Sequence, residues 1–424
     1  MSITGLYWFT QDLRLHDNAT LLDATRRCDR LLCVYCIDPA WFETGEFGSA
    51  RLGRHRWRFL NETLDDLEQR LAARGQHLIR CFRSPGPALD ALIEQHRVDV
   101  VVRSQSADWY LEKAWESLQR RWPDVEFAER VTHTLFDRDA LPFTLDELPG
   151  SFTQFRKRVE PLGIAAPVAA PEALPPPVDN ASLSSPPSPP PMPETTDDPD
   201  SAFRGGEREG LAHLDAYFGG SLPLHYKQTR NALEGWQNSS KFSAWLANGA
   251  LSGRLVIERL RDFEQRVGAN ESTYWLYFEL LWREFYQWYA HAHGARLFRL
   301  SGLKGESPRP DRDRARFAAW GRGETGLPIV DACMRELNAT GYMSNRGRQL
   351  VASALINELN QDWRWGAAYF EQQLVDYDVA SNWGNWQYLG GVGADPRGLR
   401  RFDLAKQTAQ YDPQGTFIAR WLNG

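Results

Sequence analysis

A proline-rich stretch divides the sequence into two parts. Residues 167–199 hold 12 of the 25 prolines of the 424-residue chain. The stretch is also rich in Ser, Asp and Glu and has almost no large apolar side chains, so it buries too little surface to offset the entropy lost on ordering. It therefore predicts a solvated linker between an N-terminal and a C-terminal domain.

Before this stretch, short apolar runs alternate with amphipathic segments. The apolar runs that predict buried strands are residues 3–9, 31–37, 78–82 and 98–102. The side chains that recur at three- and four-residue spacing, as on one helix face, are Trp57, Leu60, Leu64, Leu67 and Leu71. Strands alternating with helices predict an α/β domain over residues 1–130, with a doubly wound, mostly parallel, Rossmann-like sheet.

After the stretch, the sequence changes to long helical periods. Val256, Leu260, Phe263 and Val267 recur with helical spacing, and no strand-like alternation competes with it. The sequence predicts an all-α domain over residues 205–424, joined to the first domain by a linker over residues 131–204. Most of the 17 tryptophans lie beyond residue 235, which indicates a particular use of indole rings in the helical part.

Composition excludes several classes of protein. The chain is 42% hydrophobic and 25% charged with a formal net charge of −6, as expected for a soluble protein. No apolar run approaches the roughly 20 residues that cross a bilayer, and the first residues do not form a signal peptide. We therefore expect a cytoplasmic protein without a membrane partner. Residues 201–424 carry 27 Lys and Arg against 24 Asp and Glu, too small an excess to establish nucleic-acid binding by itself.

The five cysteines predict neither disulfides nor a metal site. Their number is odd, and a large cytoplasmic chain keeps its thiols reduced. Cys33 and Cys36 form a Cys-x-x-Cys pair, but they lie in a predicted strand, where residues three apart point to opposite faces. No second Cys or Cys/His pair lies at ligand spacing, so we expect packing thiols and no metal.

Polar side chains recur among aromatics on the predicted helices. Glu279, Trp282, Arg283 and Tyr286 fall at i, i+3, i+4 and i+7, so they share one face. Two further faces combine Asn345 with Arg348, and Asp378 with Asn382 and Trp386. Ion pairs in the protein interior, such as Arg230 or Arg348 with Asp376, would explain why any one of these polar residues lies on a buried face. Together they favour a polar cavity lined with Arg, Asp, Asn and Trp.

A serine cluster precedes another predicted helix. Ser239, Ser240 and Ser243 lie where backbone N–H groups are free and the helix dipole is positive, which suits a diphosphate. Taken alone, such a cluster is more often a helix cap.

With these residues considered together, the sequence resembles the photolyase/cryptochrome family, and within it the cryptochrome-DASH branch. The segments that carry the resemblance are STYWLYFELLWREF, TGYMSNRGRQLVASAL, DYDVASNWGNWQYLGGVGADPR and KQTAQYDPQGTFIARW. The likeness covers nearly the whole chain. It implies an α/β domain followed by a helical domain that binds FAD.

The resemblance also implies which residues contact FAD. The residues expected around the diphosphate and adenosine are Tyr226, Ser239, Ser240, Lys241, Phe242 and Ser243. Those expected around the isoalloxazine ring are Arg348, Asp376, Asp378 and Asn382. Further expected contacts with FAD are Arg230, Glu279, Arg283 and Asn345. A cation beside the ring would stabilise the anionic reduced flavin, and the Asn382 amide can donate or accept at N5. An Arg230–Asp376 bridge is expected to hold this geometry.

The implied activity is light-driven repair of cyclobutane pyrimidine dimers by electron transfer from excited reduced FAD. Glu279 would hydrogen-bond the dimer, Trp282 would stack on it and Asn345 would contact it, with Asn382 beside the flavin as the fourth catalytic residue. Tyr286, Gln349 and Tyr388 would complete the lesion wall.

Two of these positions bear on the substrate. Gln349 and Tyr388 stand where double-strand photolyases carry Met and Trp, so the implied partner is single-stranded or looped DNA. The (6-4) photolyases carry His at the positions of Asn345 and Gln349 as acid–base catalysts; this sequence has neither, which disfavours that reaction here.

The resemblance further implies a relay of tryptophans that reduces the flavin. Trp386 and Trp363 match its proximal and middle members, but the distal position is Pro310. Trp365 lies on roughly the opposite helix face from Trp363 and is the predicted replacement that reaches solvent. An aromatic surface residue without a redox role is the alternative.

An antenna and a second function stay open. The branch often binds 5,10-methenyltetrahydrofolate between its domains; the usual acidic contact is missing here, although Gln105 could hydrogen-bond the pterin. The alternative to a monomeric repair enzyme is a blue-light photoreceptor that signals and repairs little. Retention of Glu279, Trp282 and Asn345 favours the enzyme.

Overall fold

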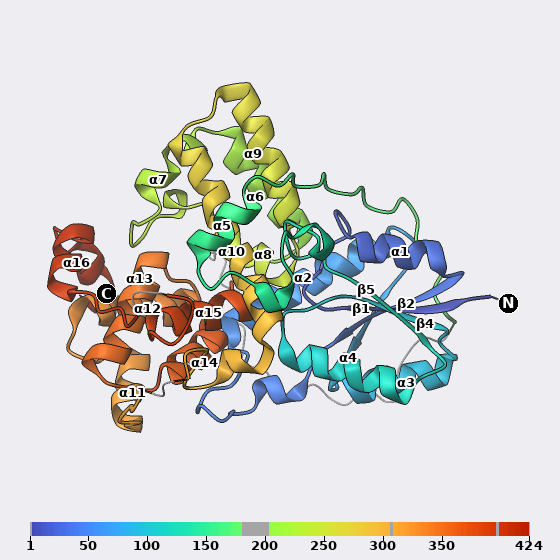
Figure 1. Cartoon of the computed structure of the whole chain (residues 1–424), viewed down its shortest axis with the longest axis horizontal. Helices are drawn as coiled ribbons and strands as arrows, with labels where there is room; N and C mark the ends of the chain where they lie inside the picture. Colours follow the sequence, from blue (N-terminus) through green and yellow to red (C-terminus); the bar gives the residue numbers. More distant parts are fainter. Residues whose placement is uncertain (1, 180–202, 306–307, 396–397, 424) are drawn as a thin grey trace.

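The N-terminal domain is built on a five-stranded parallel sheet. The computed structural model describes residues 2–179, 203–305, 308–395 and 398–423 (Figure 1). The strands are β1 (Thr4–Phe9), β2 (Arg30–Cys36), β3 (Leu78–Cys81), β4 (Val100–Ser104) and β5 (Glu126–Arg130). Their order is β3-β2-β1-β4-β5 and all pairs are parallel, which confirms the doubly wound α/β prediction. β5 was not predicted because its side chains are mostly exposed and form no buried apolar run.

Helices cover both faces of the sheet. The two on one face are α1 (Ala19–Arg27) and α2 (Arg54–Ala72), and the two on the other are α3 (Pro85–His96) and α4 (Trp109–Arg121), as Figure 1 shows. The predicted apolar face of α2 is buried from Trp57 to Leu71. Cys33 and Cys36 lie in the cores on opposite faces, which confirms that they are packing thiols.

Residues 131–204 do more than link two domains. Among its described residues, 131–179 and 203–204, the elements are η2 (Arg138–Ala140), η3 (Leu145–Glu147) and α5 (Phe152–Val159). Phe152, Phe155 and Val159 of α5 are buried in the core of the helical domain.

The solvated-linker prediction is wrong for residues 167–179. Pro177 forms a bridge with Leu31 of β2, and Gln76 donates a hydrogen bond of 2.9 Å to the Pro175 carbonyl. Proline carbonyls remain acceptors, so a proline-rich segment can still lie along a sheet. The rest of the predicted linker, residues 180–199, lies outside the described residues.

The second domain is helical, and no β-strand occurs in its described residues. Its elements are α6 (Glu207–Gly219), η4 (Leu222–His225), α7 (Tyr226–Thr229), η5 (Trp236–Asn238), α8 (Ser243–Asn248), α9 (Gly253–Val267), α10 (Glu271–His293), η6 (Gly294–Phe298), α11 (Arg314–Arg322), α12 (Pro328–Thr340), α13 (Asn345–Ser353), η7 (Ala354–Glu358), α14 (Trp363–Gln373), α15 (Val379–Leu389), α16 (Leu404–Tyr411) and α17 (Thr416–Asn423). None of the described helices is long and apolar enough to cross a membrane.

Polar contacts fasten the two domains together. Glu207 of α6 accepts hydrogen bonds from the backbone N–H of Leu15 and from the Arg70 guanidinium, each at 2.8 Å. The buried Arg14 donates to the Gly249 carbonyl at 2.9 Å. These bonds satisfy charges that would otherwise be costly to bury.

Helices α14 and α15 pack without spare room. A Cβ atom on Gly366 would lie 2.2 Å from Cη2 of Trp386 and 2.6 Å from Cδ2 of Leu355. We predict that Gly366→Ala lowers the free energy of unfolding by about 1–3 kcal/mol, because the core must shift to admit the methyl group. Guanidinium chloride unfolding measures the change, with Gly163→Ala as control because nothing lies within 4 Å of its Cβ position. Equal unfolding midpoints for the two variants would contradict this close packing.

Candidate active site

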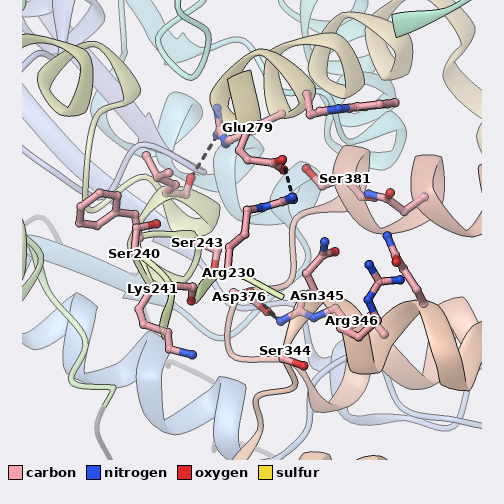
Figure 2. A pocket seen from close by; sticks show the side chains of 18 of the residues that line it. Arg230, Ser240, Lys241, Ser243, Glu279, Ser344, Asn345, Arg346, Asp376 and Ser381 are labelled. Atoms are coloured by element: carbon pink, nitrogen blue, oxygen red, sulfur yellow. Dashed lines mark hydrogen bonds and ion pairs between the residues drawn. The ribbon is translucent and has the colours of Figure 1, made fainter. Parts of the chain in front are cut away.

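A cavity of about 570 Å³ opens in the helical domain. Its size falls within the roughly 300–1,000 Å³ of ligand and cofactor pockets. Figure 2 shows its walls: the segment that leads into α8 faces residues from α10, α13 and α15. Side chains from Tyr226 to Phe402 meet here, so the cavity is assembled from distant parts of the domain.

Nearly all the predicted cofactor and lesion residues line this one cavity. Those that line it are Tyr226, Arg230, Ser239, Ser240, Lys241, Phe242, Ser243, Glu279, Trp282, Arg283, Tyr286, Asn345, Arg348, Gln349, Asp376, Asp378 and Tyr388. The exception is Asn382, which is buried and donates its amide to the Ala367 carbonyl at 2.9 Å.

One wall combines hydroxyl groups with a cation. Ser240, Lys241 and Ser243 lie side by side in Figure 2, and Ser243 begins α8. Lys241 has a backbone φ of +56°, and its ammonium lies 4.3 Å from the centre of the Tyr342 ring. Hydroxyls and an ammonium group suit the diphosphate of a dinucleotide.

The neighbouring part of the lining, beyond the Tyr342 ring that contacts both Lys241 and Arg348, is held by an ion pair. Arg348 donates to both carboxylate oxygens of Asp376, at 2.9 and 2.8 Å, and to the Met343 carbonyl at 2.8 Å. Burial lowers the pKa of Arg348, but Asp376 outweighs it and the net shift is upward. Asp378 caps α15 and accepts hydrogen bonds from Gln287 at 2.9 Å. Arg348 is therefore a fixed positive charge in the cavity wall.

The expected Arg230–Asp376 bridge is wrong. Arg230 pairs with Glu279 at 2.6 Å, while Arg348 holds Asp376 (Figure 2). The reason is that α7, which ends just before Arg230, packs against α10, which carries Glu279. Burial raises the pKa of Glu279, and Arg230 opposes the shift.

Aromatic rings surround Trp282, the residue expected to stack on a lesion. Trp282 stacks on Phe152 with centroids 3.8 Å apart, so α5 covers one face of the indole. Tyr388 meets the same indole edge-on at 5.9 Å, and its hydroxyl accepts a hydrogen bond from Arg400.

Several lining residues were not predicted. They are Asn238, Tyr342, Ser344, Arg346, Ser381, Asn385, Arg400 and Phe402, among others. Arg346 and Asn385 lie inside the family segments and could have been found there, whereas Phe402 stands outside them. The cavity has six cationic side chains against three carboxylates, an excess of three positive charges that suits an anionic ligand.

The three predicted relay tryptophans lie outside the cavity lining. Trp386 packs on Trp320, with centroids 6.3 Å apart, and Trp363 packs on Trp383 at 5.9 Å. The expectation that Trp365 reaches solvent is wrong, because the residue is only 5% exposed. The Arg314 guanidinium covers its ring at 4.0 Å from the centroid.

Comparison with known proteins agrees with this architecture. The model for DNA photolyase matches residues 5–176, and the model for the FAD binding domain of DNA photolyase matches residues 275–424. Cryptochrome DASH of Idiomarina loihiensis is 49% identical over 98% of this chain and 92% of its own length, and that of Vibrio parahaemolyticus is 48% identical over 98% and 93%. The chain belongs to the cryptochrome-DASH branch of the photolyase/cryptochrome family.

Solved structures of the family have the same fold. The Synechocystis cryptochrome superposes with a TM-score of 0.94 at 41% identity, covering 99% of this chain and 88% of its own. A class III photolyase from Agrobacterium tumefaciens superposes with a TM-score of 0.82 at 27% identity, covering 100% and 87%. The second domain of this cryptochrome-DASH protein is accordingly the FAD-binding domain, and the hydroxyls, cations and volume of the cavity fit that cofactor.

Proposed function

We propose that this protein binds FAD in the cavity and repairs cyclobutane pyrimidine dimers in single-stranded or looped DNA under blue light. The observation that carries the proposal is that the predicted lesion contacts line the same cavity as the predicted cofactor contacts. When bound, reduced FAD supplies an electron to the dimer on excitation. Side chains of the protein would bind and orient the cofactor and would recognise the lesion.

The cavity residues hold and orient the cofactor. Ser239, Ser240, Ser243 and Lys241 would bind the diphosphate, and Arg348 would offer its charge to the anionic ring. The net positive charge of the lining supports binding of a ligand with several negative charges. A role for Asn382 at the flavin stays a prediction, because its amide faces the Ala367 carbonyl.

The lesion side recognises an extruded dimer. Phe152 stacks on Trp282 at 3.8 Å and Tyr286 lies near-parallel to it at 5.7 Å, so the indole is held in a fixed orientation at the cavity wall, where it would stack on the dimer. Glu279, supported by Arg230, would hydrogen-bond the dimer, and Asn345 would add an amide contact. Tyr286, Gln349 and Tyr388 complete this wall.

The first experiment compares repair of a dimer-bearing oligonucleotide as a single strand and as a duplex, under blue light with reductant. We expect repair of the single strand and much slower repair of the duplex, because extruding a stacked, paired lesion costs a few kcal/mol. Loss of the dimer is measured by chromatography of the digested DNA.

Each outcome bears on a different part of the proposal. Comparable repair of both substrates would show that Gln349 and Tyr388 do not limit access of duplex DNA. Repair of neither substrate, with reduced FAD bound, would overturn the repair function in favour of a photoreceptor. We further propose a monomeric, cytoplasmic protein, and a folate antenna contacted by Gln105 remains a prediction.

A further inference from the structure

A line of aromatic rings connects the FAD-binding domain with the surface of the N-terminal domain. Trp383 packs on Trp363 with centroids 5.9 Å apart and on Phe298 of η6 with centroids 4.8 Å apart. Phe298 in turn lies 6.0 Å from Tyr110 at the start of α4. Tyr110 is 52% exposed, so this line of rings ends in solvent.

The inner end of the line lies against α15, the helix that carries the predicted proximal tryptophan, Trp386. A Cβ atom on Gly390 would be 3.1 Å from the Trp386 carbonyl oxygen and 3.5 Å from Cδ1 of Trp363. The Trp363 indole therefore packs against the end of α15, one turn beyond the Trp386 backbone. Trp383, on the same helix, continues the line outward.

We propose that Tyr110 is the terminal electron donor for reduction of the bound flavin and that Trp383 connects it to Trp363. This inference rests on the proposed function. It replaces the route through Trp365 and joins the N-terminal domain to the redox chemistry of the helical domain.

Electrostatics disfavours Trp365 as the terminal donor. The Arg314 guanidinium lies 4.0 Å from the centre of its ring and would repel the positive charge of an oxidised indole. Tyr110 also has a guanidinium nearby, that of Arg51 at 4.9 Å. A tyrosine, however, releases its phenolic proton on oxidation, and the exposed Tyr110 can pass it to water. The oxidised residue is then neutral and is not repelled.

The electrons and protons balance in this sequence. With FAD bound and illuminated, Trp386 would give one electron to the oxidised flavin. Trp363 would then reduce Trp386, Trp383 would reduce Trp363, and Tyr110 would reduce Trp383. Phe298 lies between the last two and is not itself oxidised. Tyr110 loses one electron to Trp383 and one proton to water, and a soluble thiol returns both.

The test compares Tyr110→Phe and Trp383→Phe with Trp365→Phe in the FAD-loaded full chain. Tyr110→Phe keeps the ring of an exposed residue and removes only the hydroxyl, so the fold is retained. We expect Tyr110→Phe and Trp383→Phe to slow blue-light reduction of FAD by dithiothreitol several-fold, and Trp365→Phe to leave the rate unchanged. Tyr274→Phe, at another exposed tyrosine, is the matched control.

A spectroscopic readout separates a redox role from a structural one. Electron paramagnetic resonance of the illuminated wild-type protein should show a tyrosyl radical whose signal narrows with ring-deuterated tyrosine and disappears in Tyr110→Phe. A radical that persists in Tyr110→Phe, or slowing by Trp365→Phe alone, would overturn the proposal. Protein that has been reduced chemically does not need this electron route to repair DNA. Failure of the chemically reduced protein to repair dimers would therefore count against the proposed function and not against the route.

Discussion

Replacing Arg348 with methionine is expected to remove most of the FAD from the purified protein and to lower the free energy of unfolding by about 3–5 kcal/mol. The buried carboxylate of Asp376 would lose both of its charge-assisted hydrogen bonds, and the cavity would lose a cation beside the expected flavin ring. The absorbance ratio of flavin to protein and guanidinium chloride unfolding measure the two effects.

Two comparisons separate cofactor binding from folding. Arg322→Met removes an exposed ion pair with Glu324, which contributes about 0–1 kcal/mol at most. The double variant Arg348→Met/Asp376→Leu replaces the whole pair with apolar groups, so we expect it to regain stability but not FAD. FAD content equal to wild type in Arg348→Met would show that Arg348 does not bind the cofactor.

Replacing Glu279 with alanine is expected to reduce repair of a single-stranded dimer roughly ten- to a hundredfold, since a hydrogen bond to a charged group contributes about 1.5–3 kcal/mol. The lost bond would be the one that stabilises the dimer after it has received an electron. Repair is measured per absorbed photon with chemically reduced protein, together with its FAD content.

The pH profile tests the same residue. Burial raises the pKa of Glu279, so the neutral carboxyl, which can donate a hydrogen bond, persists to a higher pH than in an exposed glutamate. Repair by the wild type should decline as the pH rises through this pKa, and Glu279→Gln should lack this decline.

Glu271→Ala serves as the control on the same helix. Glu271 pairs with Lys227 at 2.8 Å, but its side chain is 78% exposed. We expect no change in repair. Equal losses in the two glutamate variants would indicate a general effect on α10 rather than a contact with the lesion.

Features that depend on local spacing were predictable from the sequence. The apolar face of α2, the buried strands β1 to β4 and the shared face of Glu279, Trp282 and Arg283 on α10 all follow from periods of two or 3.6 residues. β5 lacks a buried run, so the same reasoning could not find it. The grouping of residues from different helices around one cavity did not follow from spacing; it was implied by the resemblance to the photolyase/cryptochrome family, and the cavity lining agrees with it.

The sequence by itself determined two domains of different class and the faces of the main helices, and through its resemblance to the family it indicated 17 of the 33 residues that line the cavity. Only the tertiary structure decided that Arg230 pairs with Glu279 and Arg348 with Asp376, that Trp365 lies under Arg314, and that Trp383 leads toward Tyr110. The periodicity of apolar side chains is a property of a single helix or strand and can be seen in residues that are close in the sequence. The partner of a charged side chain or an aromatic ring depends on how helices from distant parts of the chain pack together. The spacing of residues within one helix does not determine that packing.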